Sequence, residues 1–337
     1  MLWLRLVRSG PSTGETALCF SSAAWNAEWN TVWVTSSARP RTLYVSDLDG
    51  TLLGSGGSVG EASAEVLNTA IEAGGLFTYA TARSFLTSRK ATAGLRLNLP
   101  VVTYGGTVTV HPGSGEHLDL RLLDPAAVES VLSLCVSHPA AEPILHTFEN
   151  GRDWVRWRPE RVTAGVTAFL DARAGDPRLR PITTNDPLNP SAVFYVAILG
   201  ENSALGDLRR KLLPDLTRAA HFLSVDPGTP GLDWLEFHNV EGTKAKAIRR
   251  LMLRVSADRL VVFGDNHNDL PMFEIADESY AVSNAIPAVR NAATGVIGSN
   301  DEGAVARWIA DDMRYRARTA LPGYLETRRA SYADGRC

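Results

Sequence analysis

A strand–helix–strand rhythm near both ends of the chain is the feature that most constrains its fold. Short apolar or β-branched runs at Thr42–Ser46, Leu76–Ala80 and Pro100–Tyr104 surround a helix-spaced run over Glu61–Ala73. Buried parallel strands take the form of such short runs, and their alternation with helices predicts a parallel sheet with right-handed crossovers. The region from 42 to 110 therefore predicts one part of an α/β core.

The same alternation returns near the other end of the chain. Helical spacing covers Gly242–Val255, and an apolar strand is predicted at Arg259–Phe263. Further elements are predicted as the helices Leu270–Ala276, Ile286–Ala293 and Glu302–Met313 and the strands Ser279–Val282 and Gly295–Ile297. The two regions together predict one Rossmann-like parallel sheet.

The middle of the chain has a different pattern. Thr107–Val110 and His117–Leu120 flank the turn signal Pro112-Gly113-Ser114-Gly115 and predict a hairpin. Mixed elements follow, predicted as the helices Pro125–Ser137 and Ser203–Leu213 and the strands Ile144–Phe148, Trp154–Trp157, Ala192–Leu199 and Ala220–Val225. We therefore predict an α+β domain over 111–225, inserted into a core formed by 42–110 and 226–313.

The two ends of the chain lie outside this pattern. Residues 1–41 hold four of the eight tryptophans (Trp3, Trp25, Trp29 and Trp33) without a clear period. This stretch is either a partner-binding arm or a poorly ordered extension, and we predict the latter. Residues 314–337 are predicted to be a solvated tail.

Composition narrows the classes of function. The 337 residues are 45% hydrophobic and 21% charged, as in folded globular proteins, and the net charge of -3 predicts no nucleic-acid or anionic membrane partner. No apolar run reaches the roughly 18 residues that a membrane span needs. Cys19, Cys135 and Cys337 are too scattered for a zinc site or a disulfide framework. We predict a cytoplasmic protein with a small-molecule partner; its oligomeric state is not specified.

The first segment with candidate chemistry is Asp47-Leu48-Asp49-Gly50-Thr51. The preceding strand delivers Asp47 and Asp49 to its carboxyl end, where open α/β sheets bind their ligands. Both carboxylates face one site if the loop bends, and Gly50 permits that bend. A D-x-D alone also occurs in solvated turns and in metal-binding glycosyltransferases.

A second acidic loop follows the strand at Arg259–Phe263. Asp265, Asn268 and Asp269 offer the hard oxygen ligands that suit Mg²⁺. The alternative is an Asn/Asp-rich turn that caps the next helix. Asp269 precedes Leu270-Pro271 and is able to do both.

Two further residues suit a phosphate group. Thr81 follows a strand and precedes a predicted helix from Ala82, where hydroxyl and free N–H groups bind anions; it is alternatively an ordinary helix N-cap. Lys244 lies in the first turn of a predicted helix, which the helix dipole disfavours unless the ammonium neutralises a ligand. The alternative, an exposed helix lysine, fits Lys246 better.

These segments together resemble the haloacid dehalogenase (HAD) superfamily. DLDGTLL, ATAR, TKAKAI and GDNHNDLPMF match its four motifs in order, and Ala281–Ala285 resembles a later V-x-x-N-A segment. The place of the inserted block resembles the Cof-type, class IIB capped branch. The resemblance covers about Arg41–Asp312. The chain differs at Ala82, Gly105 and Ala245, where the family often has Gly, Asn and Gly.

The resemblance implies a Mg²⁺-dependent phosphatase that acts on a sugar phosphate or a similar small metabolite. Asp47 would be the nucleophile that forms an aspartyl-phosphate, and Asp49 the general acid and base. Phosphate oxygens would be bound by Thr81, Lys244 and Asn268. Mg²⁺ would be held by Asp47, the backbone carbonyl of Asp49, Asp265 and, directly or through water, Asp269.

The inserted domain would be a cap that closes over the core and selects the substrate. Candidate residues that face the cleft are Glu149, Arg152, Asp153 and Asn189. His238, beside the predicted strand Trp234–Phe237, either lines the cleft or only packs there. Three other functions stay open at this point. They are a phosphomutase with the same nucleophile, a D-x-D glycosyltransferase and a non-catalytic binder of a phosphorylated ligand.

Overall fold

The computed structural model describes residues 5–7, 17–19, 40–138, 141–212, 219–225 and 231–319. The chain divides into two units, Met1–Pro40 and Arg41–Cys337. In the first unit, β1 (Arg5–Val7) pairs antiparallel with β2 (Ala17–Cys19), which the sequence did not predict. The expectation of a poorly ordered extension concerns residues that mostly lie outside the described ones.

The core of the second unit is a five-stranded parallel sheet with the order β15-β14-β13-β3-β4. β3 and β13 are more than 200 residues apart in the chain, yet they pair at its centre, and every residue of both is buried. The predicted parallel α/β core is therefore confirmed. Its strands are β3 (Thr42–Ser46), β4 (Leu76–Tyr79), β13 (Arg259–Gly264), β14 (Glu278–Val282) and β15 (Gly295–Ile297).

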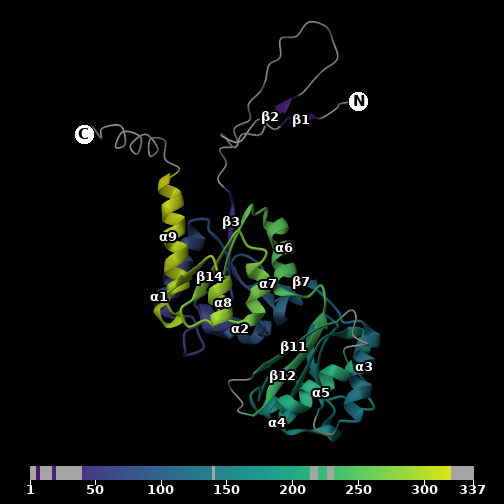
Figure 1. Cartoon of the computed structure of the whole chain (residues 1–337). Helices are drawn as coiled ribbons and strands as arrows, with labels where there is room; N and C mark the ends of the chain where they lie inside the picture. The colour runs from purple at the N-terminus through teal and green to yellow at the C-terminus, as the bar shows by residue number, and fades with distance from the viewer. Residues whose placement is uncertain are drawn as a thin grey trace, which may run out of the picture. The chain divides into compact units, whose positions relative to one another are not determined.

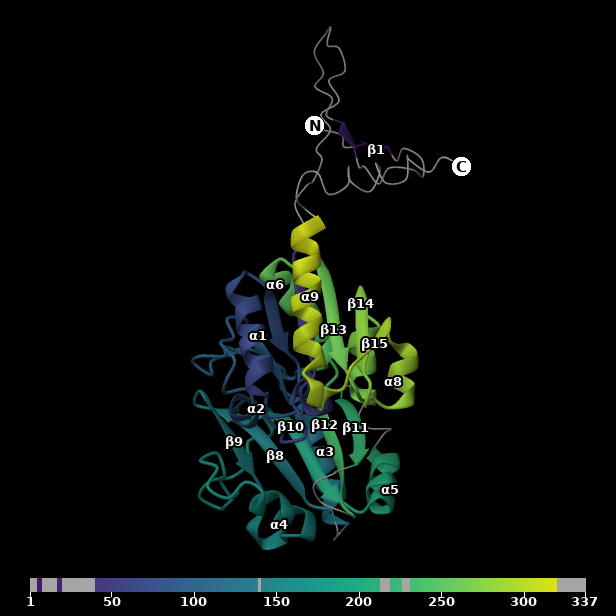
Figure 2. The ribbon, with the colours of Figure 1, turned by 90° about the vertical axis from the view of Figure 1, so that its left-hand side faces the viewer.

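Helices cover both faces of this sheet (Figures 1 and 2). On one face, the Trp308 ring packs on Tyr44, Phe263 and Tyr280. That face carries α1 (Glu61–Glu72) and α9 (Ala304–Thr319), and the other carries α6 (Lys244–Val255) and α7 (Leu270–Phe273). The remaining core helices are α2 (Phe85–Ala91) and α8 (Pro287–Ala292). Among the described residues, no helix has the length and apolar character that a membrane span requires.

A small antiparallel sheet continues the core beyond β4. The backbone bridge between Ala80 and Val102 joins the two. The sheet consists of β5 (Val101–Thr103), β6 (Val108–Val110) and β7 (His117–Leu120). The predicted hairpin is therefore present, and it belongs beside the core.

The inserted domain is an antiparallel sheet with helices on both faces. Leu145, Val196 and Leu235 pack against two of these helices, while Ile144 and Leu199 pack against the third. The strand order is β11-β12-β10-β8-β9, with β8 (Pro143–Glu149), β9 (Arg152–Arg156), β10 (Val193–Gly200), β11 (Ala219–Val225) and β12 (Asp233–Asn239). The first face carries α3 (Pro125–Val136) and α5 (Asn202–Leu212), and the second carries α4 (Ala164–Asp171), which the sequence did not predict.

The strand pairing corrects the predicted domain boundaries. The predicted division placed 111–225 in the insert, but β7 pairs with β6 of the core side. It also placed 226–313 in the core, but β12 lies between β10 and β11 in the inserted sheet. Leu235 and Phe237 of β12 are buried in the insert's own apolar cluster, and this burial decides where the strand belongs. By this pairing, the insert runs from about α3 to the end of β12.

The last helix is longer than predicted. α9 continues to Thr319, six residues beyond the predicted helix end at Met313. Arg314 pairs with Asp311 and Arg316 with Asp312, at the i+3 and i+4 spacings that stabilise a helix surface.

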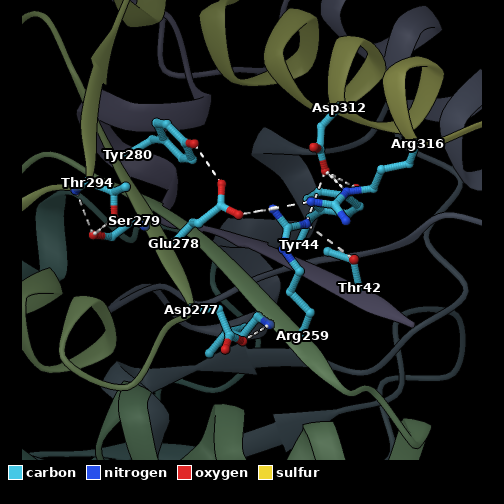
Figure 3. Close-up of polar contacts among 11 residues, drawn as sticks. Thr42, Tyr44, Arg259, Asp277, Glu278, Ser279, Tyr280, Thr294, Asp312 and Arg316 are labelled. Atoms are coloured by element: carbon cyan, nitrogen blue, oxygen red, sulfur yellow. Dashed lines mark hydrogen bonds and ion pairs between the residues drawn. The ribbon is translucent and has the colours of Figure 1, made fainter. Parts of the chain in front are cut away.

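A charged cluster joins α9 to the amino ends of the core strands (Figure 3). Arg259, the first residue of β13, donates to Asp312 at 3.1 Å and to Thr42 at 3.3 Å, and it also pairs with Glu278. The Tyr44 hydroxyl donates to Asp312 at 2.7 Å. Burial, and then the adjacent Asp312 carboxylate, raise the pKa of Tyr44. The cluster therefore ties α9 to β3, β13 and β14 through paired charges.

Replacing Arg259 with Ala should lower the free energy of unfolding by about 3 kcal/mol, because two carboxylates would lose their buried cation. Urea denaturation followed by circular dichroism measures this change. Arg307→Ala is the matched control, because its pair with Glu302 is exposed and such pairs contribute less than about 1 kcal/mol. Equal losses in the two variants would contradict a structural role for the cluster.

Candidate active site

The carboxyl ends of the core strands bring the predicted segments together. Asp47 follows β3, and its backbone N–H donates to the Phe263 carbonyl of β13 at 2.9 Å. Asp265 follows β13 directly. Thr81 lies just beyond β4, where its N–H donates to the Val102 carbonyl at 3.0 Å. Residues from three distant parts of the chain therefore meet at one edge, as the topology of a parallel sheet requires.

Lys244 connects two buried carboxylates at this edge. Its Nζ lies 2.5 Å from Oδ1 of Asp47 and 2.8 Å from Oδ1 of Asp269. The predicted position in the first turn of a helix is confirmed, and Thr243 provides the N-cap by accepting from the Lys246 N–H. Burial disfavours the ammonium, but the charges of Asp269 and Asp47 outweigh it and raise the pKa of Lys244. Lys246 instead pairs with Glu241 at the surface.

Asp269 also organises the second acidic loop. Its Oδ2 accepts from the backbone N–H groups of Asp265 at 2.9 Å and Asn266 at 3.2 Å. Asp269 occupies the N-cap position of α7, but its side chain makes no capping bond to that helix and instead holds the acidic loop. A Cβ on Gly264 would overlap the Asp269 side chain, so this close packing requires glycine.

Three carboxylates gather within metal-binding distance. Asp47, Asp265 and Asp269 each offer an oxygen, and these oxygens lie within 4.8 Å of one another. Burial raises the pKa of Asp47 well above its usual range; Lys244 opposes this rise, whereas Asp269 and Asp265 add to it. Burial and the charge of Asp269 raise the pKa of Asp265 to about 6. Such closely spaced hard oxygens fit a divalent cation such as Mg²⁺.

The D-x-D loop bends as the sequence predicts. Gly50 adopts a positive φ of 74°, and a Cβ there would collide with the Asp265 carboxylate. Thr51 donates from Oγ1 to Oδ1 of Asp265 at 3.1 Å. Asn284, in the later segment noted in the sequence, donates to the Gly50 carbonyl at 2.8 Å. The two acidic loops are thereby held against each other.

Arg83 is a site residue to which the sequence analysis assigned no role. Its Nη2 and Nε lie 2.5 Å and 2.8 Å from the two carboxylate oxygens of Asp49, which is more than half exposed. This fork–fork geometry orients a carboxylate more firmly than a single contact does. The ATAR segment contained Arg83, but its partner lies 34 residues earlier, and no local pattern reveals such a pair.

Thr81 is buried, but it is not a helix N-cap. α2 begins at Phe85 with Ser84 as its cap, three residues later than the predicted start at Ala82. The Thr81 hydroxyl oxygen accepts from the Arg83 N–H at 3.1 Å, which leaves its hydrogen for another acceptor. Asn268 lies exposed in the same short turn as Asp269. Both residues are therefore placed at the carboxyl edge, and their roles stay predictions.

The inserted domain contacts the core beside this edge. The Tyr104 ring packs edge-on against Phe194 at 5.0 Å and His146 at 5.1 Å, and its hydroxyl accepts from Arg178 at 2.9 Å. A second nitrogen of Arg178 donates to Ser84 Oγ at 3.3 Å. The cap is thus tied to the residue that follows Arg83.

The five residues considered in the sequence as candidates for the substrate cleft occupy different places in the structure. Asp153 lines a cavity between cap and core. His238 is buried and stacks on Phe222 within the inserted sheet. The remaining three, Glu149, Arg152 and Asn189, are absent from the lining of that cavity.

A family model described as haloacid dehalogenase-like hydrolase matches residues 44–309. The chain belongs to the haloacid dehalogenase-like hydrolases. This match spans both parts of the core and the whole insert. The resemblance read from the four motifs is therefore confirmed, and so is the capped architecture.

Curated relatives of this HAD chain are named as phosphatases. An HMP-PP phosphatase of Cronobacter sakazakii is 29% identical over 247 residues, which cover 73% of this chain and 85% of the relative. A 5-amino-6-(5-phospho-D-ribitylamino)uracil phosphatase of Bacillus subtilis is 23% identical over 281 residues, covering 80% and 96%.

Solved structures show the same fold. A haloacid dehalogenase-like hydrolase from Bacteroides thetaiotaomicron superposes with a TM-score of 0.64 at 22% identity, over 80% of this chain and 98% of that one. A HAD subclass IIB sugar phosphatase superposes with a TM-score of 0.61 at 16% identity, over 83% and 100%.

The raised pKa of Asp265 predicts pH-dependent Mg²⁺ binding by this HAD chain. A proton and the cation compete for the same carboxylates, so Mg²⁺ affinity should fall by about tenfold or more as the pH drops from 7.5 to 5.5, through the value of about 6. Calorimetric titration at the two pH values measures this. Asp265→Asn should bind weakly at both, and the surface control Asp311→Asn should behave like wild type. A pH-independent affinity would contradict this assignment.

Proposed function

We propose that the chain is a Mg²⁺-dependent phosphatase that hydrolyses a phosphate monoester of a small metabolite through an aspartyl-phosphate on Asp47. The observation that carries the proposal is the buried contact of 2.5 Å between Lys244 and Asp47 inside a cluster of acidic oxygens. The buried ammonium opposes the rise in the pKa of Asp47 that burial causes, and so favours the ionised carboxylate that a nucleophile requires; it also attracts a phosphate to the same place.

Two displacements at phosphorus complete the reaction. In the first, an Asp47 oxygen bonds to phosphorus as the ester P–O bond breaks, and Asp49 gives its proton to the leaving oxygen. In the second, Asp49 takes a proton from water as the water oxygen bonds to phosphorus. The bond to Asp47 then breaks, which releases inorganic phosphate and restores the carboxylate.

Lys244, Thr81 and Asn268 would bind the phosphate oxygens. Lys244 lies against Asp47 and cannot move far, because Asp269 holds its Nζ from the other side. The Thr81 hydroxyl already accepts a backbone N–H, so its own hydrogen is free to donate to phosphate. Donors fixed before the substrate arrives stabilise the charge of the transition state most effectively.

The metal site would consist of Asp47, the backbone carbonyl of Asp49, and Asp265. Asp269 fits a water-mediated role better than direct ligation, because Lys244 and two backbone N–H groups already contact its oxygens. Bound Mg²⁺ offsets the repulsion between the carboxylates and the phosphate. Thr51 would keep the Asp265 carboxylate in place.

Arg83 would be a positioning residue for Asp49. Its guanidinium sets the direction of the Asp49 carboxylate through two hydrogen bonds. In the second step this carboxylate accepts the proton of the attacking water. The first step needs Asp49 protonated, so the arriving substrate phosphate would have to draw Arg83 away from it.

Other functions receive less support. A phosphomutase shares the nucleophile, but the names of the relatives favour hydrolysis. A D-x-D glycosyltransferase does not explain the contacts of Lys244 with Asp47 and Asp269. A non-catalytic binder does not explain the pair of Asp49 and Arg83. Relatives named for HMP-PP and for a phosphorylated aminouracil support a small phosphorylated metabolite as substrate. A cytoplasmic location stays our prediction.

Hydrolysis of p-nitrophenyl phosphate with Mg²⁺ tests the reaction itself. Asp47→Asn should lower kcat by at least about 10³-fold, because no covalent intermediate forms, and chelation of the metal should abolish wild-type turnover. Asp258→Asn is the matched control, because Asp258 lies at the amino end of β13 and not at the carboxyl ends, where the site is. Turnover retained by Asp47→Asn would refute the nucleophile.

Arg83→Ala should reduce kcat by about 10- to 100-fold, because a general acid–base loses its orientation. In the double variant with Asp49→Asn, removing Arg83 should cost no further activity, since the two residues act as one unit. Steady-state kinetics of the two single variants and the double variant measures these changes in kcat. Additive losses in the double variant would refute the coupling.

A further inference from the structure

A cavity of about 460 Å³ lies where the inserted domain meets the core. This volume is within the range of sites for small molecules. The core contributes the start of α2 and residues of β7, and the cap contributes the β8–β9 hairpin and Arg178. In Figure 2, α2 lies directly above β8 and β9. The lining therefore combines both domains.

Flat aromatic surfaces form part of the lining. Phe148 of the cap stacks on His117 of the core, with ring centres 4.5 Å apart and an interplanar angle of 22°. Phe85, the first residue of α2, adds a third ring to the lining. Rings of this kind favour a planar aromatic ligand over a puckered sugar.

Hydrogen-bond acceptors in this cavity lack partners. Nε2 of His117 lies 3.1 Å from Oδ1 of Asp153, and both side chains are nearly buried. Oδ1 of Asp153 makes this ion pair, but within the described part of the chain neither it nor Nδ1 of His117 accepts a hydrogen bond from any other group. Glu116 supplies a second carboxylate. Because carboxylates only accept hydrogen bonds, the complementary ligand carries hydrogen-bond donors. The aromatic lining favours donors on a planar ring, which are amino groups, over the hydroxyls of a sugar.

The segment from Arg83 to Phe85 connects the cavity to the acid–base residue of the proposed reaction. Phe85 follows Arg83 by two residues, a span of at most about 7 Å, and Arg83 contacts Asp49 directly. Between them, Ser84 accepts a hydrogen bond from Arg178, which also lines the cavity. A group bonded to the leaving oxygen at Asp49 would therefore extend toward this space.

We infer that this cavity is the subsite for the leaving group, and that it takes a planar nitrogen heterocycle with exocyclic amino groups. The inference rests on the proposed phosphatase function. Phe85, Phe148 and His117 cover the faces of the ring, and Asp153 and Glu116 accept its amino hydrogens. Arg178 donates to a ring nitrogen or carbonyl at the edge nearest the core.

Steady-state kinetics on three esters tests the inference. The esters are an aminopyrimidinylmethyl phosphate, a hexose 6-phosphate and p-nitrophenyl phosphate. The aminopyrimidine ester should show a kcat/KM at least about tenfold above that of the hexose ester. Asp153→Asn should lower its kcat/KM about tenfold, mainly through KM, because an acceptor becomes a donor. Turnover of p-nitrophenyl phosphate should stay within about twofold, because that ester has no amino group for Asp153 to bind.

Asp207→Asn is the matched control, because it makes the same change on the exposed surface of α5, away from the cavity. It should leave all three esters unaffected. If wild type hydrolyses p-nitrophenyl phosphate but shows no preference for the aminopyrimidine ester, the inference is overturned and the proposed function survives. A lack of effect of Asp153→Asn would overturn it equally.

Direct binding separates the two claims further. If wild type hydrolyses none of the esters, the proposed function fails, and calorimetry with the unphosphorylated aminopyrimidine alcohol decides the subsite alone. Binding weakened about tenfold by Asp153→Asn would support the subsite, and absent or unchanged binding would overturn it. If Asp153→Asn does not fold, Phe148→Leu takes its place in both measurements, with loss of the stacking face expected to weaken binding.

Discussion

The buried contact of Lys244 with Asp47 and Asp269 is the interaction on which the rest of the structure depends. Placing charges in an apolar interior is unfavourable unless partners and hydrogen bonds compensate them. Each oxygen of Asp269 is accordingly in use, one by Lys244 and the other by backbone N–H groups. Close packing at Gly50 and Gly264 keeps the second loop against the first. The sheet therefore serves mainly to fix the spacing of a few charges.

The two ends of the central strands differ in their charge balance. At the amino ends, Arg259 and Arg316 face Glu278 and Asp312, so two cations balance two carboxylates (Figure 3). At the carboxyl ends, three carboxylates surround a single ammonium. The first cluster is complete in itself and stabilises the fold, whereas the second has an excess of negative charge. Among the described residues, that excess favours the binding of a divalent cation at the carboxyl ends rather than at the amino ends.

Much of the core and of the candidate site could be predicted from local sequence. The strands β3 and β13 are short apolar runs that end in acidic residues, so topology alone placed Asp47 and Asp265 together. Local patterns failed where a distant partner decides the outcome. Arg83 acquires its role from Asp49 across the site, and β12 joins the insert because β10 and β11 lie on its two sides. The helix N-cap, which was the alternative role for Thr81, belongs instead to Ser84, which accepts the Thr87 N–H where α2 begins.

The connection between cap and core runs directly into Lys244, the proposed phosphate-binding residue. β12 ends at Asn239, and Lys244 begins α6 only five residues later. Gly106 leaves no room for a side chain against the Thr243 backbone, and Thr107 contacts the Gly242 carbonyl. The core side of this connection is therefore packed in place. Any movement of the cap must be taken up between Asn239 and Gly242, because displacement beyond that point would separate Lys244 from Asp47 and leave a buried charge uncompensated.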